Sequence, residues 1–167
     1  SALLHEVGKI AIHDNILKKP AALTDEEYEI MKGHPQKGYK IMSQIPAMKE
    51  FLPGMYMHHE MVNGKGYPQG LKGDEIPLMG KIVAVADTFD AMTTDRPYQK
   101  AMKFEDALAR IESFVGTRYD EGVVAAFSSA SKEGQIRPGQ VKLKKPTTPA
   151  PSPQISQKAQ INDSLSA

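Results

Sequence analysis

The sequence predicts an all-α domain, and three features indicate this fold class. Thr24 is followed three residues later by Glu27, the pattern of a capping box at the start of a helix. Residues 78–94 are largely apolar over the length of a helix, and residues 104–114 and 119–127 repeat apolar positions at helical spacing. A chain of 167 residues has enough material for one domain with a buried core.

The first half of the chain is expected to contain several short helices. Residues 1–8 fit the last turns of one helix, and the capping box starts the next helix at Asp25. Pro35 interrupts that helix, because the residue before a proline avoids the α conformation, and it suits the first turn of a new one. Residues 47–59 are expected to form a further helix that is kinked or split at Pro53.

The second half is expected to be built around a central helix over residues 78–94. Asp87 lies amid the apolar surface of this helix, where an unpaired carboxylate would be costly. Binding of a metal ion would remove that cost. Asp90, three residues on, could instead orient a metal-binding histidine. Residues 104–114 and 119–127 are expected to close the core.

Composition limits the kinds of site and partner. A net charge of +1 argues against a protein built mainly to bind DNA or RNA. The absence of cysteine excludes disulfides and thiolate zinc sites, and it fits a reducing, cytoplasmic compartment. No apolar run approaches the roughly 18 residues needed to span a membrane. After residue 127 the chain turns rich in Pro, Ser and Gln, which predicts a domain over residues 1–130 and a disordered tail over residues 131–167.

The few histidines indicate a metal centre. Neutral imidazole is the commonest metal ligand in proteins. His58 and His59 are adjacent, so around a helix axis they would differ by about 100° and could bind two metals or flank one. His5 lies near a helix end and His34 at a helix break, while His13 is expected outside the site. Taken singly, each could be an ordinary surface or capping histidine.

A glycine-rich bend follows the histidine pair directly, with the sequence Asn63-Gly64-Lys65-Gly66-Tyr67-Pro68. Glycine allows positive φ and close approach of the backbone to a ligand. A surface turn is the simpler interpretation of such a bend, but it does not explain why the bend comes straight after two histidines.

Together these segments resemble the HD-GYP family of phosphodiesterases, which hydrolyse cyclic di-GMP. The resemblance extends over about residues 1–127. The matching segments fall in family order, at residues 3–10, 34–39, 58–68, 68–73, 82–87, 95–98 and 116–117.

The resemblance implies an HD-superfamily helical bundle with a two- or three-metal centre. The ligands it implies are His5, Glu6, His34, His58, His59 and Asp87. A set with only nitrogen and oxygen donors suits iron or manganese, with zinc or nickel as alternatives. Two cations ~3.5–4 Å apart can activate a hydroxide for in-line attack on phosphorus. The implied products are the linear dinucleotide and, by further cleavage, GMP.

The resemblance also implies groups that contact the substrate. Lys9 would act in catalysis with Glu6, by neutralising developing charge or protonating the leaving group. Arg96 offers a planar fork and Lys100 a point charge for the phosphate oxygens. In the family the loop that contains Gly66, Tyr67 and Pro68 lines the site and can contact partner domains. The expected partners are cyclic di-GMP, a diguanylate cyclase domain and an N-terminal receiver or sensor domain of a two-component system.

The chain departs from the family pattern at several points. Glu6 stands where the family has Asp, Asn63 where it usually has Asp, and Arg118 where it usually has His. The chain also begins inside the His-Asp helix, so we expect a fragment that lacks an upstream ligand. The extra methylene of Glu6 would move its carboxylate outward by ~1.5 Å, and we expect weakened or altered metal loading.

Two other functions remain open from the sequence. The first is a receptor without catalysis, which binds cyclic di-GMP or a cyclase domain through the Tyr67-Pro68 loop. The second is hydrolysis of another phosphoester, which would leave the glycine-rich loop and residues 95–98 unexplained.

Overall fold

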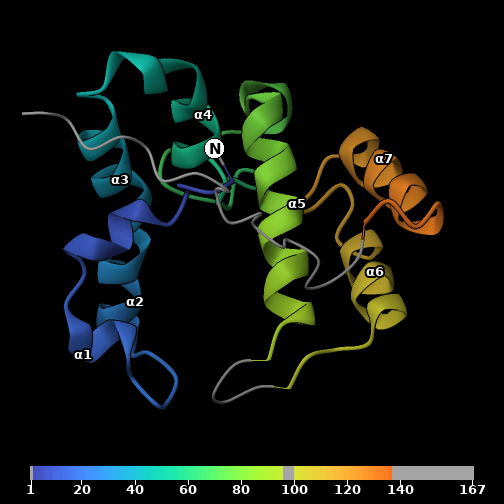
Figure 1. Cartoon of the computed structure of the whole chain (residues 1–167), viewed down its shortest axis with the longest axis horizontal. Helices are drawn as coiled ribbons and strands as arrows, with labels where there is room; N and C mark the ends of the chain where they lie inside the picture. Colours follow the sequence, from blue (N-terminus) through green and yellow to red (C-terminus); the bar gives the residue numbers. More distant parts are fainter. Residues whose placement is uncertain (1, 96–99, 137–167) are drawn as a thin grey trace, which may run out of the picture.

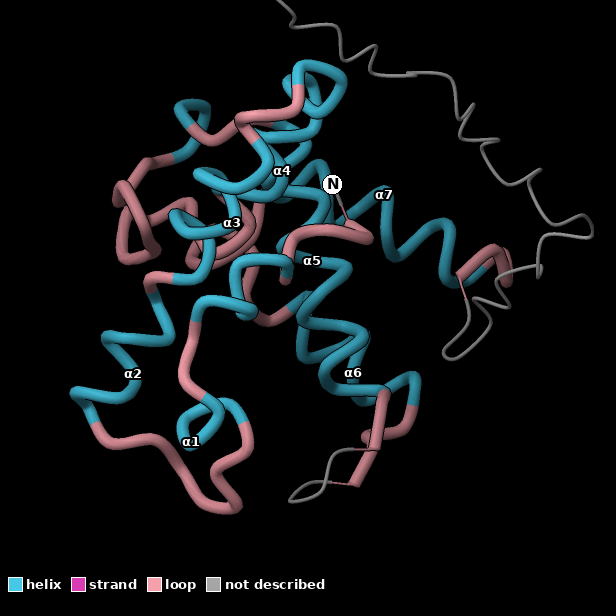
Figure 2. The backbone as a smooth tube through the Cα atoms, turned by 60° about the vertical axis from the view of Figure 1, so that its left-hand side comes forward, coloured by secondary structure: helices cyan, strands magenta, loops and turns pink. Residues whose placement is uncertain are grey.

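A computed structural model describes residues 2–95 and 100–136. Over these two ranges every regular element is a helix and there is no strand, as Figure 2 shows, which confirms the all-α class. The elements in chain order are η1 (Val7–Ala11), α1 (Asp14–Leu17), α2 (Asp25–Lys32), α3 (His34–Met42), η2 (Pro46–Phe51), α4 (Leu52–Tyr56), η3 (Gly73–Glu75), α5 (Leu78–Thr93), α6 (Phe104–Glu112) and α7 (Glu121–Lys132), where η marks a 3₁₀ helix. The start predicted for the disordered tail is wrong, because α7 continues to Lys132 and Ile136 packs against the hydrophobic core. The rest of the predicted tail, residues 137–167, lies outside the described residues.

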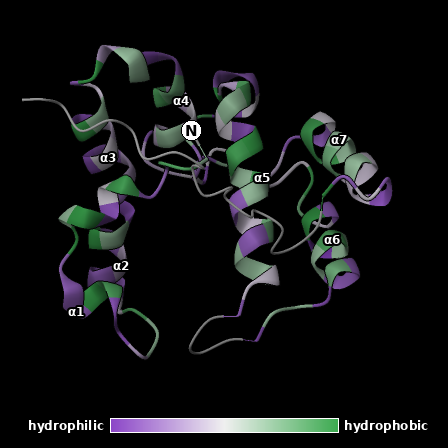
Figure 3. Ribbon diagram, viewed as in Figure 1, coloured by the Kyte–Doolittle hydropathy of each residue, from purple (hydrophilic) through white to green (hydrophobic). Residues whose placement is uncertain are grey.

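Helix α5 is the centre of the fold, as its apolar sequence predicted. In Figure 1 the helices α1 to α4 lie on one side of α5, and α6 and α7 lie on the other. Figure 3 shows hydrophobic residues on several turns of α5, α6 and α7. The Phe89 ring of α5 meets Phe104 of α6 and Phe127 of α7 edge-on, at centroid distances of 5.3 and 5.0 Å. Within the described ranges no helix is long and apolar enough to cross a membrane.

Two hydrophobic clusters form the core. The larger cluster joins α5, α6 and α7 around the fully buried Ala107 and Ile111. The smaller one joins α3 to α4 through Met42, Leu52 and Met55, and Val7 of η1 packs against it. Because α5 also packs against α4, this helix links the two halves of the molecule.

The capping box predicted at the start of α2 is confirmed. The Thr24 hydroxyl accepts a hydrogen bond from the Glu27 amide at 3.3 Å, and the Glu27 carboxylate accepts one from the Thr24 amide at 2.7 Å. The break and restart at His34-Pro35 is also confirmed, since α3 begins at His34 directly after α2 and the Gly33 cap.

Two expected helices are wrong in part. Residues 2–6 form turns and lead into the 3₁₀ helix η1, whose backbone at Gly8 lies against α3. Residues 47–59 are split near Pro53, as predicted: η2 ends at Phe51 and α4 begins at Leu52 with Pro53 in its first turn, where a missing amide hydrogen is tolerated. The predicted helix is wrong in its end, because α4 stops at Tyr56. His58 and His59 therefore lie in the turn that follows α4.

Candidate metal centre

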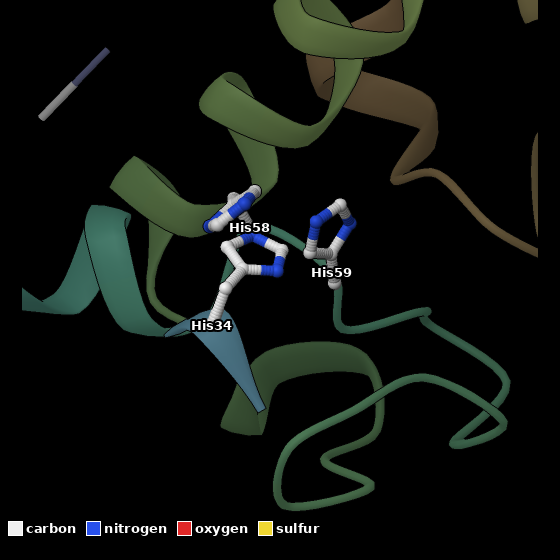
Figure 4. Close-up of side chains that lie close together, drawn as sticks. All are labelled: His34, His58 and His59. Carbon is white, nitrogen blue, oxygen red and sulfur yellow. The ribbon is translucent and has the colours of Figure 1, made fainter. Parts of the chain in front are cut away.

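Four histidines from three separate segments meet beside α5. The ring centroid of His58 lies 4.9 Å from that of His5, 5.5 Å from that of His34 and 4.0 Å from that of His59. Figure 4 shows His34 at the start of α3 with its ring close to those of His58 and His59. The structure thus brings together the histidines that the sequence singled out. His13 is exposed and precedes α1.

Three of these histidines are held by the same local contact. Their Nδ1 atoms lie within hydrogen-bond distance of the carbonyl oxygen three residues earlier, at 2.6 Å from Ala2 to His5, 2.8 Å from Met31 to His34 and 2.7 Å from Met55 to His58. A carbonyl can only accept, so Nδ1 carries the proton in each ring. In His34 and His58 Nε2 then keeps its lone pair, while Nε2 of His5 lies 3.2 Å from the Asp87 carboxylate. Backbone carbonyls therefore orient the rings, and Asp90, considered for that role, is exposed and accepts a bond from Thr94.

The first ligand group consists of His34, His58 and His59. Each offers one nitrogen, and these nitrogens all lie within 4.8 Å of one another. Nε2 of His34 and Nε2 of His58 are buried and have no hydrogen-bond partner among the described residues. A buried nitrogen left without a partner is unfavourable, so the pair fits a bound cation. The His59 ring stacks on Tyr67 at 4.7 Å.

The second ligand group consists of His5, Glu6 and Asp87, again with ligand atoms within 4.8 Å. Nε2 of His5 lies 3.2 Å from Asp87 Oδ1 and 3.7 Å from Glu6 Oε1. The other oxygen of Glu6 lies 3.7 Å from Nε2 of His34, and it too is buried without a hydrogen-bond partner in the described part of the chain. Glu6 thus faces both groups and fits a carboxylate shared between two cations.

Burial keeps the first group neutral. It lowers the pKa of His58 to about 4 and that of His59 to about 2, and it also lowers the pKa of His34. In the second group burial acts against charge on both His5 and Asp87. Their mutual hydrogen bond outweighs it, so the pKa of His5 is raised and that of Asp87 is lowered. The rings of the first group are therefore available as ligands at neutral pH.

A cavity of about 600 Å³ opens onto both groups. Its polar lining residues are Glu6, Lys9, Lys19, His34, His59, Tyr67 and Asp87. The Lys9 ammonium is half-exposed and donates to Glu6 Oε1 at 2.6 Å. Lys9 and Tyr67 are thus placed beside the ligand groups, as the sequence predicted.

Among the described residues, the other predicted substrate contacts do not line this cavity. Lys100 is exposed and does not line it, and Arg96 lies outside the described residues. Gly66 serves the loop itself, because a Cβ there would lie 2.3 Å from the amide nitrogen of Met61. Pro68 follows Tyr67 through a cis peptide bond and does not line the cavity either.

Sequence reasoning missed two residues next to the centre. Glu60 is buried, and its carboxylate accepts hydrogen bonds from the amides of Gln69 at 2.6 Å and Leu71 at 3.0 Å, which fixes the glycine-rich loop. Its place directly after the histidine pair was the available signal. Arg118, which the sequence marked only as a departure from the family pattern, lines a second cavity of about 260 Å³ together with His58 and His59.

A helical fold with two groups of histidine and carboxylate ligands beside one cavity defines a class of metal-binding α-domains. The chain belongs to the HD domain family, whose model matches residues 1–123. This confirms the HD-superfamily fold and the resemblance found in the sequence.

The relatives include enzymes named for cyclic dinucleotides. A cyclic di-GMP phosphodiesterase of Thermotoga maritima is 48% identical over 135 residues, which cover 80% of this chain and 37% of that protein. The cyclic di-GMP phosphodiesterase response regulator RpfG of Xanthomonas campestris is 43% identical, covering 76% and 34%. The 3′3′-cGAMP-specific phosphodiesterase 3 of Vibrio cholerae is 38% identical, covering 78% and 28%.

A solved structure shares the fold. The crystal structure of a cyclic GMP-AMP-specific phosphodiesterase of Vibrio cholerae superposes with a TM-score of 0.59 at 18% identity, covering 80% of this chain and 37% of that one. The chain thus spans about a third of the length of the relatives it matches.

Proposed function

We propose that this domain is a metal-dependent phosphodiesterase that hydrolyses cyclic di-GMP to the linear dinucleotide and, by further cleavage, to GMP. The proposal depends most on one observation, the two ligand groups that face a single cavity of about 600 Å³. A cavity of this size suits a ligand larger than a mononucleotide. The names of the relatives support the same substrate and a role in bacterial second-messenger signalling.

The residues present fit a two-metal centre. His34, His58 and His59 would hold one cation and His5, Glu6 and Asp87 the other, with Glu6 facing both. The donor set favours iron or manganese over zinc or nickel. Divalent cations in these positions would supply Lewis acidity toward a phosphodiester.

The chain's own side chains would bind the substrate and handle charge. The Lys9 ammonium lies in the cavity next to Glu6, where it can neutralise a phosphate oxygen or donate a proton to the departing ribose oxygen. Burial raises the pKa of Tyr67, so its hydroxyl keeps its proton and can donate to a phosphate or ribose oxygen. Arg96 and Lys100 stay predicted contacts of the non-bridging oxygens.

The test is incubation of Mn²⁺- or Fe²⁺-loaded protein with cyclic di-GMP, followed by chromatography of the nucleotides. We expect the linear dinucleotide as product, and its loss in the His34→Ala variant. His13→Ala is the matched control, because His13 is exposed and lies outside the centre. Turnover of mononucleotides but not of cyclic di-GMP would instead indicate another phosphoester as substrate.

A receptor without catalysis is the second candidate, and the Lys9–Glu6 contact favours it. One oxygen of Glu6 is engaged by Lys9 at 2.6 Å, so this carboxylate is less available as a ligand. Binding of cyclic di-GMP without cleavage by the metal-loaded protein would select this candidate. A cyclase domain at the Tyr67-Pro68 loop, or a receiver domain such as the name of the Xanthomonas response regulator suggests, would then be the partner to test.

A further inference from the structure

The main cavity has an apolar part that the metal chemistry does not need. Besides the ligand groups, it is lined by Leu17 at the end of α1, by Leu23 in the following loop and by Met31 of α2. A phosphate alone would leave this surface unused. The flat face of a nucleobase can pack against leucine and methionine while its polar edge stays available for hydrogen bonds.

One cation, Lys19, lies at this apolar part. It lines the cavity, and its side chain is one-quarter exposed. Its ammonium donates to a Glu27 oxygen, and the same oxygen accepts from the Thr24 amide at 2.7 Å, so the α2 capping box holds the lysine in place. An ammonium has three donors, and within the described ranges Glu27 is the one partner found for Lys19. Two donors remain for a ligand in the cavity.

We propose that Lys19 recognises the edge of a guanine base and sets a preference for guanine over adenine. This inference rests on the proposed function, since it assigns a base of the dinucleotide to this cavity. Guanine presents two acceptors side by side, O6 and N7, to which a lysine can donate. Adenine presents N7 beside an N6 amino group, which is itself a donor and repels an ammonium. Leu17, Leu23 and Met31 would contact the base.

The neighbouring Lys18 provides a matched control. Its side chain is three-quarters exposed, pairs with Asp14 at 2.6 Å and does not line the cavity. The two lysines have the same chemistry and adjacent positions, so a difference between their variants reports on the cavity alone.

The experiment is calorimetric titration of GMP and AMP into the metal-free wild type and into the Lys19→Met, Lys19→Arg and Lys18→Met variants. We expect the wild type to prefer GMP, and Lys19→Met to lower this preference by about tenfold. Lys19→Arg should keep it, because a guanidinium also donates to O6 and N7, and Lys18→Met should leave it unchanged. Thermal melting of each variant checks that α2 stays folded.

Several results would overturn the inference. They are equal binding of GMP and AMP by the wild type, binding of neither, or an unchanged GMP preference in Lys19→Met. If Lys19→Met melts early, loss of the preference in the folded Lys19→Arg variant would also count against it.

Turnover separates this inference from the proposed function. Bis(p-nitrophenyl) phosphate contains a phosphodiester but no guanine, so Lys19→Met should raise the KM for cyclic di-GMP by a larger factor than it changes the hydrolysis of bis(p-nitrophenyl) phosphate, while Lys18→Met should change neither. If the metal-loaded wild type cleaves neither compound, the proposed function fails, and the titrations with GMP and AMP still decide the role of Lys19.

Discussion

At the scale of single residues, the centre depends on how each side chain is presented. His5, His34 and His58 each approach the carbonyl three residues earlier with Nδ1, which directs Nε2 toward the centre. For His59 no such bond is found within the described part of the chain, and its ring stacks on Tyr67. The candidate ligands are thus held in place by the protein itself, which would reduce the cost of ordering them around an ion.

Glu6 is the residue whose length matters most. It faces both His5 and His34 at 3.7 Å, while its contact with Lys9 is much closer at 2.6 Å. Glu6→Asp withdraws the carboxylate by about 1.5 Å. We predict higher metal content and turnover raised by roughly tenfold, because misplacement by about 1 Å can cost up to about 10²-fold in rate.

Elemental analysis and cyclic di-GMP turnover measure this effect. Glu29→Asp is the control, because Glu29 is an exposed residue of α2 that pairs only with Lys32 among the described residues. Metal content and turnover that stay the same in Glu6→Asp would show that the longer side chain does not disturb the centre.

At the scale of elements, two short contacts hold the segments that carry the ligands. The 3₁₀ helix η1 lies directly on α3, so that His5, Glu6 and His34 share one site. The glycine-rich loop is tied to the segment before α7, since the amides of Val62 and Asn63 donate to the carbonyls of Arg118 and Thr117. These contacts join residues that are far apart along the chain.

Gly8 is the point where η1 meets α3. A Cβ at this position would lie 1.9 Å from the His34 carbonyl oxygen and 2.5 Å from the Gly38 amide, and both are backbone atoms that cannot rotate away. We predict that Gly8→Ala destabilises the protein by about 2 kcal/mol or more in urea unfolding, and that it lowers metal content. Gly122→Ala is the control, because its Cβ would meet only the Asp120 side chain, at 3.3 Å.

Asp120 stabilises the start of α7 in two ways. It accepts from the Val123 amide at 3.1 Å as the N-cap, and it pairs with Lys81 of α5 at 2.9 Å. The Lys81 contact, aided by the cap, lowers the pKa of Asp120. Asp120→Ala should cost about 1 kcal/mol or more of unfolding free energy, while Asp120→Asn keeps the cap acceptor and should cost less. Equal losses in thermal or urea unfolding would contradict the role of the cap.

At the scale of the whole molecule, the site exists only in the folded chain. The candidate ligands come from four separate segments, at residues 5–6, 34, 58–59 and 87, and gather beside α5, which packs against α4 on one side and against α6 and α7 on the other. Folding therefore transfers histidine side chains from water into the protein interior, so the free energy of unfolding depends on pH.

We predict that the metal-free protein loses stability as the pH falls from 6.5 to 5. In this range the unfolded chain takes up protons on His58 and His59, but the folded chain does not, because burial lowers their pKa values from 6.5 to about 4 and about 2. Each ring contributes up to about 1.4 kcal/mol per pH unit. The raised pKa of His5 acts in the opposite direction, because the folded chain then binds a proton more readily than the unfolded chain. This effect concerns one ring only.

Urea unfolding of chelator-treated protein at pH 6.5 and pH 5 measures this dependence. The His58→Gln and His59→Gln variants should show a weaker dependence than the wild type. The variant His13→Gln should behave as the wild type does, because His13 is exposed. A dependence that is equal in all four proteins would assign the acid sensitivity to other groups.

The sequence alone determined the helical class, the central helix and the cap at Thr24, because helical periodicity and capping are local properties. The set of candidate ligands was predicted from the few histidines together with the resemblance to the family. The tertiary structure decided which carbonyls orient the rings, where the helices near Gly8 and Pro53 end, and that Glu60, Leu17 and Lys19 lie at the centre or its cavity. These depend on contacts between segments far apart in the chain, whose distances follow only from how the helices pack around α5.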